Sequence, residues 1–488
     1  MLAPQENVCG RRTTPAKLNP SSRTKTAQKD RKTSKKKLSL NAVRSMVEAM
    51  LDSDDLLMPK LFDVASINAL LQELEPEGVA RRERVYSVPV TVSLFVQQVL
   101  SNNCGCKAVV TLLNKHRKQE QLSEVSTNTT SYCEARTRVP LPLIERLTEE
   151  TARLAYDRLS ADWRWRGHRV MLVDGAVINA PDTPENQQKY PQPSSQKPGL
   201  GFPQIRICMS ICLATGVVTD VRYGPVEGKK TGEATLFRRM FAGFKPGDIV
   251  VADSNFECYR DMAMLSAQGV SMVCNMNGTR TSPFTGHCKT IEDEIVILPR
   301  PGFDRSRFTE EEWEQLPATI AVRMIRYRVN GRKSEMTIVT TLLDHELYPA
   351  EAIAELYKHR WECELDIRSI KTVMGMNCLS CHTPEMLERE LMVYFLAYNL
   401  VRVTICDAAK ISDRKPRDMS FKNAKDSWLQ FGQDGRDIND TAWLLWSIAD
   451  SPLRKRSRPS EPRKIKRRNG KYERLKSPRD QEKQALLS

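Results

Sequence analysis

The stretch RVMLVDGAVI, residues Arg169–Ile178, marks the point where the sequence changes from helix-forming to strand-forming. Its apolar, β-branched residues predict a strand, and Asp174-Gly175 predicts a turn that closes it. Before it, from Leu38 to about Ser160, apolar residues recur every three or four positions, which predicts amphipathic helices. We therefore expect a helical N-terminal region followed by a layer that contains a β-sheet.

Beyond this strand, predicted strands and helices alternate. The runs QIRICMSICLA from Gln204 and GVVTDVRYG from Gly216 predict a hairpin. The hairpin is followed by a predicted helix and by the buried strand DIVVAD, which ends at Asp253. A second predicted helix and the strand VSMVCNMNG come next. Three antiparallel strands and then helix–strand–helix–strand are typical of an α/β layered domain.

Residues 281–344 interrupt this alternation with a β-rich segment. It contains IEDEIVILP and the pair VRMIRYRV and EMTIVTTLL, with a hairpin signal at Asn330-Gly331 between the pair. We expect an all-β insertion here, followed by a long helix from Ala350 and an apolar helix from Glu388.

The apolar run LMVYFLAYNLVRVTIC, which begins at Leu391, contains Asn399 and Arg402. Because a bilayer span needs roughly 20 apolar residues, this run predicts a buried core helix and no membrane partner. The chain opens on polar and basic residues rather than on a signal peptide, and its thirteen cysteines are scattered. These features predict a protein of the reducing cytoplasm.

The net charge of +15 is concentrated in two segments. Eleven Lys or Arg and one acid lie between Arg11 and Lys37, and thirteen Lys or Arg and two acids between Arg454 and Arg479. Such blocks usually stay unfolded and commonly bind polyanions. The alternative is a pair of solubilising tails.

Two aspartates each close an apolar predicted strand, Asp174 in LVDG and Asp253 in VVAD. Ligand sites of α/β folds lie at the carboxyl ends of strands. Aspartate is also common wherever strands become turns. The two residues are therefore candidates for a site, and turn residues are the alternative.

The predicted helix after Ala350 carries a basic stripe with one acid. At 100° per residue, its members lie within about 80° of arc beside an apolar face. They are Tyr357, Arg360, Glu364, Arg368 and Lys371. The alternative is an exposed face with a Glu364–Arg368 ion pair, but that arrangement would intersperse acids and bases. The segregation favours a surface that binds an anion.

Two aspartates and a glutamate set among Arg and Lys suit phosphodiester chemistry. Carboxylate oxygens bind hard divalent cations such as Mg²⁺. Two ions about 4 Å apart activate a nucleophile and stabilise the leaving oxygen of a phosphoryl displacement. Nearby basic side chains neutralise flanking phosphates. The residues therefore predict DNA cleavage or strand transfer.

The spacing Tyr357-x2-Arg360-x3-Glu364-x6-Lys371 resembles the Y-R-E-K signature of the cut-and-paste DDE transposases of insertion-sequence family four. LVDGAVINAPDTPEN and VVADSNF resemble the first- and second-aspartate regions of that family. Four further segments extend the resemblance over roughly residues 130–480. They are SYCEAR, GKKTGEATLFRRM, the TVMGM…TPEM segment and PRKIKRRNGKY.

This resemblance implies a ribonuclease H-like catalytic domain in which Asp174, Asp253 and Glu364 bind two Mg²⁺ or Mn²⁺ ions. It implies that Tyr357, Arg360 and Lys371 contact DNA beside the scissile phosphate. Arg368 is a further predicted DNA contact, because it lies on the same basic stripe. Hydrolysis would expose a 3′-hydroxyl that forms a hairpin, before opening and joining to target DNA. The partners implied are inverted-repeat transposon ends and target DNA, bound by a homodimer in the nucleoid-associated cytoplasm.

The expected organisation has five parts. Residues 1–37 are expected to form a basic disordered tail, and residues 38–135 a helical domain that binds transposon ends. The catalytic domain is expected in two segments, 136–280 and 345–412, separated by the β-rich insertion 281–344. Residues 413–488 are expected to form a C-terminal region with a basic tail. Two alternatives remain: a catalytically silent DNA-binding protein derived from such an enzyme, and a ribonuclease H-like nuclease without transposition.

Three other signals carry less weight. Cys378-x-x-Cys381-His382 matches a haem-attachment pattern, but the chain has no export signal and no second ligand pair for zinc. GPVEGKKT, from Gly224, misses the spacing of a P-loop, so neither haem nor ATP is expected. Trp313 either stacks on a flipped base or packs within the insertion, and packing is favoured.

Overall fold

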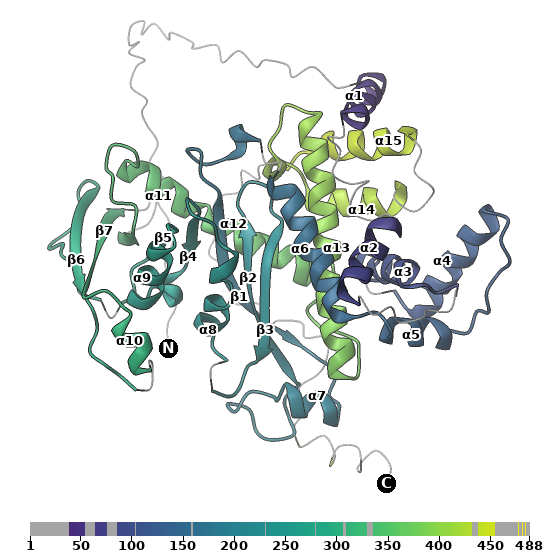
Figure 1. Ribbon diagram of the computed structural model, residues 1–488, viewed down its shortest axis with the longest axis horizontal. Helices are drawn as coiled ribbons and strands as arrows, with labels where there is room; N and C mark the ends of the chain where they lie inside the picture. Colours follow the sequence, from purple (N-terminus) through teal and green to yellow (C-terminus); the bar gives the residue numbers. More distant parts are fainter. Residues whose placement is uncertain are drawn as a thin grey trace, which may run out of the picture. The chain divides into compact units, whose positions relative to one another are not determined.

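The computed structural model describes most of the chain between residues 39 and 453 (Figure 1). The described residues are 39–53, 64–75, 85–102, 104–157, 160–229, 231–278, 280–305, 309–328, 335–431, 438–453 and the single positions 477, 481 and 484. The predictions for the two basic tails and for the Asn330-Gly331 turn fall outside these residues.

One mixed sheet of eight strands organises the described chain, in the order β3-β2-β1-β4-β5-β8-β7-β6. Its strands are β1 (Val170–Asn179), β2 (Gln204–Cys212), β3 (Val218–Pro225), β4 (Ile249–Ala252), β5 (Ser271–Asn275), β6 (Glu292–Pro299), β7 (Thr319–Arg328) and β8 (Glu335–Thr340). β1–β3 are antiparallel, whereas β4 and β5 run parallel to β1. With α8 (Glu233–Arg238) and α9 (Tyr259–Ala267) between the later strands, the predicted element order is confirmed.

Strand β1 is longer than predicted, and the turn expected at Asp174-Gly175 is wrong. β2 pairs with β1 from Met171 through Asn179, so the backbone hydrogen bonds of Asp174-Gly175 are made within the sheet. The first half of β1 is buried on both faces, and so is the whole of β4. Apolar residues without alternation are typical of strands covered on both sides.

The segment 281–344 extends the same sheet. β8 pairs with the edge of β5, and β7 pairs with both β8 and β6, so VRMIRYRV and EMTIVTTLL form adjacent antiparallel strands as predicted. The prediction that the segment is entirely β is wrong, because Glu310–Glu314 form helix α10. Thr309 and Glu312 form a reciprocal capping box that explains this short helix.

Helices occupy the described chain before β1, as predicted. They are α1 (Leu40–Asp52), α2 (Val64–Leu74), α3 (Val88–Leu100), α4 (Cys106–Gln119), α5 (Thr130–Thr137) and α6 (Leu141–Asp157), followed by the short η2 (Ala161–Trp163). Short helices between strands also include α7 (Pro184–Lys189), η3 (Phe241–Gly243) and η4 (Ser254–Phe256).

Helix α13 (Pro384–Lys410) is the central helix of the core (Figure 1). It is long and apolar enough to cross a membrane by composition, but that apolar stretch is wholly buried within the protein. It contacts α3 and α6, which precede it in the sequence, and α14 (Phe421–Phe431) and α15 (Ile438–Ala449), which follow it. The short helix η6 (Pro416–Asp418) lies between α13 and α14 in the sequence. The prediction of a buried core helix is confirmed.

Two polar residues of α13, Asn399 and Arg402, find partners inside the core. Asn399 accepts a hydrogen bond from the N–H of Val218 at 2.8 Å and donates one to its carbonyl at 2.9 Å. Arg402 forms an ion pair with Asp366, which is fully buried and also pairs with Arg417 at 2.6 Å. Buried polar groups that are paired in this way orient α13 on the sheet rather than weaken it.

Candidate active site

Asp174 lies inside β1, at the level where the parallel strand β4 stops. The register pairs Leu172 with Val251, so its extension by two residues places Asp174 opposite Asp253. The two aspartates are therefore neighbours at the carboxyl end of β4, although Asp174 is not at the end of its own strand.

Asp253 follows β4 and caps the short helix η4 (Ser254–Phe256). Its carboxylate accepts hydrogen bonds from the backbone N–H of Asn255 at 2.8 Å and from the Asn255 side-chain amide at 3.3 Å. These bonds hold the carboxylate at the sheet edge where α/β folds place ligands.

The single long helix predicted from Ala350 is wrong. The chain forms α11 (Ala350–Lys358) and α12 (Arg360–Arg368), which meet at His359, and then a π-helical turn, η5 (Ser369–Val373). The N–H of His359 bonds to the carbonyl of Leu356, and the carbonyl of His359 accepts from Glu362, so the backbone tightens at this point. A π turn has more residues per turn than an α-helix, so a single 100° wheel does not extend to Lys371.

The five residues of the predicted stripe therefore have different surroundings. Tyr357 is buried at the end of α11, and burial raises the pKa of its hydroxyl, while Arg360 lowers it. Lys371 donates a hydrogen bond at 2.8 Å to the carbonyl of Val177 in β1. Arg368 is exposed on α12. The remaining two, Arg360 and Glu364, face the aspartates.

Arg360 lies between two of the three acids. Its guanidinium forms an ion pair with Glu364 at 2.7 Å and approaches the carboxylate of Asp174 at 3.7 Å. The i,i+4 partner of Glu364 is thus Arg360 and not Arg368. In this arrangement the arginine provides positive charge between carboxylates that belong to different elements.

The pKa of Asp174 reflects its burial and the charged groups around it. Burial raises its pKa to about 6, and a hydrogen bond from the N–H of Gly175 lowers it. Asp253 and Glu364 raise the pKa further, whereas Arg360 lowers it. A carboxyl that is buried near two other acids favours its protonated form unless additional positive charge is nearby.

The chemistry of these residues fits a hard divalent cation. Asp174, Asp253 and Glu364 offer carboxylate oxygens, the ligands preferred by Mg²⁺ and Mn²⁺. Within the residues that the structure describes, no three His, Cys, Asp or Glu side chains are close enough to hold a metal ion as they stand. Arg360 provides positive charge beside Asp174 and Glu364.

The sequence analysis did not single out Glu233, a further acid near this end of the sheet. It begins α8, and its carboxylate lies against the backbone of Gly175, on the face of β1 opposite to the Asp174 side chain. Asp253 raises the pKa of Glu233, after burial as the largest cause. Glu233 falls within the GEATLFRRM run, but an acid in the first turn of a helix is too common a feature to identify it.

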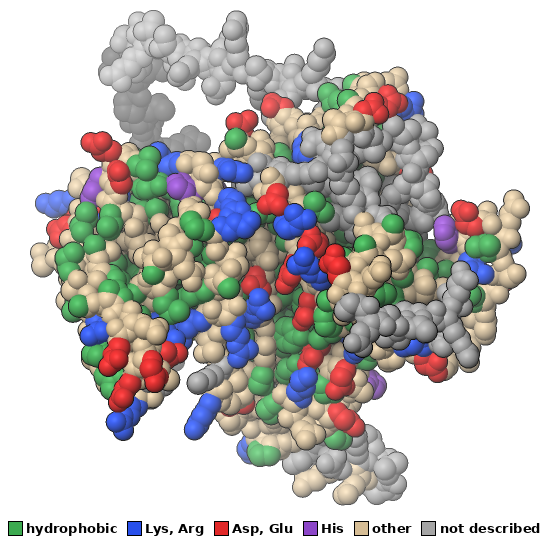
Figure 2. Space-filling model, in the orientation of Figure 1, with side chains coloured by type: hydrophobic (Ala, Val, Ile, Leu, Met, Phe, Trp, Pro, Cys, Tyr) green, Lys and Arg blue, Asp and Glu red, His purple; other side chains and the backbone are tan. Residues whose placement is uncertain are grey.

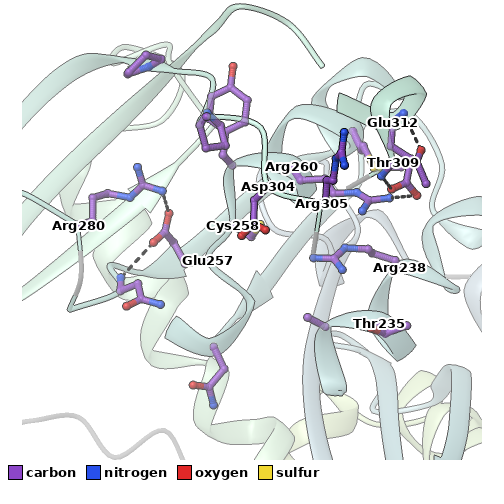
Figure 3. Close-up of a pocket in the computed structure, with 18 of the residues that line it drawn as sticks. Thr235, Arg238, Glu257, Cys258, Arg260, Arg280, Asp304, Arg305, Thr309 and Glu312 are labelled. Atoms are coloured by element: carbon purple, nitrogen blue, oxygen red, sulfur yellow. Dashed lines mark hydrogen bonds and ion pairs between the residues drawn. The ribbon is translucent and has the colours of Figure 1, made fainter. Parts of the chain in front are cut away.

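A cavity of about 1390 Å³ lies between α8, α9 and the segment 281–344, and Asn255, which bonds to Asp253, is one of the residues that line it. Figure 3 shows Arg238, Arg260 and Arg305 directed toward one region of this cavity, with the Arg280–Glu257 pair farther away. Acids offset several of these charges: Arg238 pairs with Asp261 at 2.6 Å and Arg260 with Glu312 at 2.8 Å.

Arg239, which also lines the cavity, is exposed, and no ion pair involves it among the described residues. Figure 2 shows Lys and Arg side chains along the middle of the face in view, with acidic side chains between them. This mixed surface provides separate basic contacts rather than one continuous positive field.

Trp313 is packed within the segment 281–344. Its indole N–H donates to the carbonyl of Pro301 at 2.9 Å, and the guanidinium of Arg300 lies 3.6 Å from the ring centroid. Phe303 contacts its edge at 5.9 Å between centroids. These contacts agree with the packing role that the sequence favoured.

The two cysteines of the haem-like pattern make structural contacts, whereas His382 is exposed. Cys381 is buried, its backbone N–H donates to Glu390 at 2.9 Å, and burial raises the pKa of its thiol. Cys378 bridges to Asn179 at the end of β1. These contacts give the pattern a structural role where β1 meets the loop before α13.

Comparison with known proteins identifies the region that contains these acids. Residues 165–400 match the family described as "Transposase DDE domain", and this range includes Asp174, Asp253 and Glu364. The transposase InsG for insertion sequence element IS4 of Escherichia coli strain K12 is 25% identical over 301 residues. The match covers 60% of this chain and 64% of that protein.

Proposed function

We propose that this chain, which belongs to the DDE transposases of insertion-sequence family four, cuts the ends of a mobile DNA element and joins them to target DNA. The observation that carries the proposal is the β1–β4 register, which sets Asp174 opposite Asp253, together with Arg360, which links Asp174 to Glu364. The catalytic core is ribonuclease H-like in this proposal, with the sheet as its centre.

Asp174, Asp253 and Glu364 would hold the divalent ions, Mg²⁺ or Mn²⁺, that DDE transposases typically use. When bound, two such ions activate the attacking water and stabilise the leaving oxygen of the phosphodiester. The half-buried position of Asp174 limits water at the reacting phosphate, and the hydrogen bonds from Asn255 fix the orientation of Asp253.

The basic residues orient the DNA. Arg360 exchanges Glu364 and Asp174 for a phosphate oxygen when DNA is present, because a guanidinium binds either partner through the same N–H groups. Arg368 is exposed on the same helix α12 and contacts the sugar-phosphate backbone of the same DNA strand. Lys371 is bonded to β1 and holds η5 against the strand that carries Asp174.

In the full reaction sequence, water cleaves one strand at each end of the element and exposes a 3′-hydroxyl. That hydroxyl attacks the opposite strand and forms a hairpin, which a second water opens before joining to the target. Two ends must be cut together, so the active form is a dimer on DNA in the cytoplasm. The helices between residues 38 and 135 bind the transposon ends in this proposal.

The test is cleavage of linear DNA that carries the inverted repeats flanking the gene. Asp174→Asn, Asp253→Asn and Glu364→Gln should each abolish divalent-ion-dependent cleavage, while binding of the end DNA stays within about threefold. Glu362→Gln is the matched control, because Glu362 lies on the same helix α12 but not at the acid cluster. It should cleave at the wild-type rate.

The same assay separates the alternatives. A wild-type chain that binds the ends without cutting them is a silent DNA-binding protein. One that cuts without forming hairpins or joined products is a nuclease. Wild-type cleavage by any of the three acid variants rejects the assignment of the site.

A further inference from the structure

We propose that Cys106 and Cys133 are a thiol pair that a peroxide oxidises to a disulfide, which then joins helix α4 to helix α5. Both cysteines are free in the structure. The pair lies in the helical region before β1, outside the candidate active site, so the inference does not depend on the proposed function.

The two thiols are in direct contact. The Sγ atoms of Cys106 and Cys133 are 3.7 Å apart, although the residues are 27 positions apart in the sequence. Cys106 begins α4 and Cys133 lies in α5, and these two helices pack against each other (Figure 1). A disulfide bond is about 2.05 Å long, so the two sulfurs need to approach each other by only about 1.7 Å.

Both thiols also line one cavity. It has a volume of about 470 Å³ and is bounded by residues of α3, α4 and α5 and by the start of α13. Cys106 and Cys133 are each partly exposed, whereas Cys208, Cys212 and Cys274 are fully buried in the sheet. A small oxidant such as hydrogen peroxide therefore has access to the sulfur atoms of this pair.

A cation lies beside the pair. The guanidinium of Arg136 donates to the Sγ of Cys133 at 3.8 Å, and it lies over the ring of Phe95 at 5.0 Å from the centroid. Burial lowers the pKa of Arg136, whereas nearby thiols and the Tyr132 hydroxyl, rather than carboxylates, raise it. Positive charge beside a thiol favours the thiolate, which is the form that attacks an oxidant. We therefore assign the first attack to Cys133.

Gln98 holds Cys106 in place for the second step. The side-chain amide of Gln98 donates to the Sγ of Cys106 at 3.8 Å, and its carbonyl accepts from the Tyr132 hydroxyl at 2.9 Å. Burial raises the pKa of the Cys106 thiol, although Arg136 lowers it. Cys106 therefore stays a protonated thiol in contact with Cys133 until Cys133 is oxidised.

The reaction balances with hydrogen peroxide as the oxidant. The Cys133 thiolate attacks one peroxide oxygen and the O–O bond breaks. The departing hydroxide takes up the proton that the thiol released, so the products are a sulfenic acid and water. The Cys106 sulfur then attacks the sulfenic sulfur, forms the S–S bond and displaces hydroxide, which leaves as water with the Cys106 proton. Two thiols are oxidised, and one peroxide is reduced to two water molecules.

A structural zinc site and simple packing are the alternatives. Zinc in structural sites takes four ligands, but in the part of the chain that the structure describes no three His, Cys, Asp or Glu side chains are close enough to hold a metal ion. Packing accounts for buried thiols, but it requires neither a cation nor access from a cavity at the same two sulfurs. The contacts therefore favour chemistry between two thiols.

The experiment treats the full chain with hydrogen peroxide, removes the excess with catalase and alkylates the remaining thiols under denaturing conditions. Peptide mass mapping should find the Cys106 peptide joined to the Cys133 peptide, lighter by two hydrogen atoms than the two reduced peptides together. In Cys106→Ser the sulfenic acid has no partner, so dimedone should label Cys133. In Cys133→Ser the Cys106 thiol should stay reduced at the same peroxide concentration.

Three further variants serve as controls. Cys104→Ser removes another thiol that lines the same cavity, and it should form the disulfide at the wild-type rate. Arg136→Gln should slow disulfide formation by about threefold, because less thiolate is present to attack, and Arg136→Lys, which keeps the positive charge, should restore most of the rate. Thermal unfolding of the reduced proteins should confirm that every variant is folded.

Three results would overturn the inference. Oxidation of Cys133 to a sulfinic acid without a bond to Cys106 would show that the two sulfurs cannot meet. A disulfide to Cys104 or Cys381, or between two copies of the chain, would place the chemistry at another pair. A folded Arg136→Gln protein that forms the disulfide at the wild-type rate would remove the reason for a first attack by Cys133. DNA cleavage enters none of these measurements, so they do not test the proposed function.

Discussion

Asp174→Asn should stabilise the fold while it abolishes cleavage. Burial among acids raises the pKa of Asp174 from 3.8 to about 6. Each pKa unit corresponds to about 1.4 kcal/mol, so the ionised carboxylate lowers the free energy of unfolding by about 3 kcal/mol. The side chain is 18% exposed, so solvent screening reduces this cost only slightly.

The sign follows from proton binding. Between about pH 4 and pH 6 the folded protein binds the Asp174 proton more tightly than the unfolded chain does, so the stability of the wild type falls as the pH rises through this range. Asparagine carries no charge at any pH, and its Oδ1 still accepts the 2.8 Å hydrogen bond from Gly175. The variant should therefore gain about 2–3 kcal/mol at pH 8 and progressively less toward pH 4.

The assay is urea unfolding in a buffer with a chelator, at pH 8 and at pH 5. Glu364→Gln is the control, since it removes a charge from the same site but loses the 2.7 Å ion pair with Arg360. It should destabilise slightly, by about 0.5 kcal/mol. An Asp174→Asn protein that is less stable than the wild type at pH 8, or equally stabilised at both pH values, would refute the reasoning.

Three further predictions concern the core and the cavity. Asp366→Ala removes the acid that pairs with the buried Arg402 and the partly buried Arg417, and it should lower the free energy of unfolding by about 3–5 kcal/mol in urea titrations. Asn399→Ala leaves the backbone of Val218 unpaired and should cost about 2–4 kcal/mol in the same measurement; an unchanged midpoint would contradict the contact. Arg239→Ser should reduce the slope of log binding constant against log salt for end DNA by about 1, and an unchanged slope would place the DNA elsewhere.

Much of the fold was predictable because its strands and helices have strong periodic patterns. The segment from Gln204 to Gly278 alternates as the structure does, and the apolar run from Leu391 is a core helix. The length of β1 was not predictable from local pattern. Asp-Gly is a strong turn signal, but pairing with β2 keeps these two residues in the sheet, and that pairing depends on a partner about thirty residues away.

The candidate site residues remain predictions, and their predicted geometry agrees with the structure only in part. A helical wheel places Glu364 beside Arg360 correctly, since both lie on α12. The wheel fails at His359 and again at Ser369, where the backbone changes its hydrogen-bonding pattern without any Gly or Pro to announce the change. The roles assigned to the stripe residues remain predictions, because they depend on bound DNA.

The contacts of two acids depend on distant parts of the chain. Asp366 is buried with Arg402 and Arg417, which belong to elements that follow it in the chain. Glu233 lies against Gly175 because α8 packs on β2 and β3 and because Gly175 leaves room for it. No spacing rule within one helix or strand detects either arrangement.

The burial of α13 has a consequence for how the chain is made. Its partners α3 and α6 leave the ribosome before it, whereas α14 and α15 leave after it. Translation adds about 5–20 residues per second, so about 2–8 s pass between the synthesis of α13 and the completion of α15, the last helix that packs on it. Nascent chains are therefore most prone to aggregate in this interval, and a protein truncated after Lys410 would keep the side of α13 that packs on α14 and α15 exposed permanently.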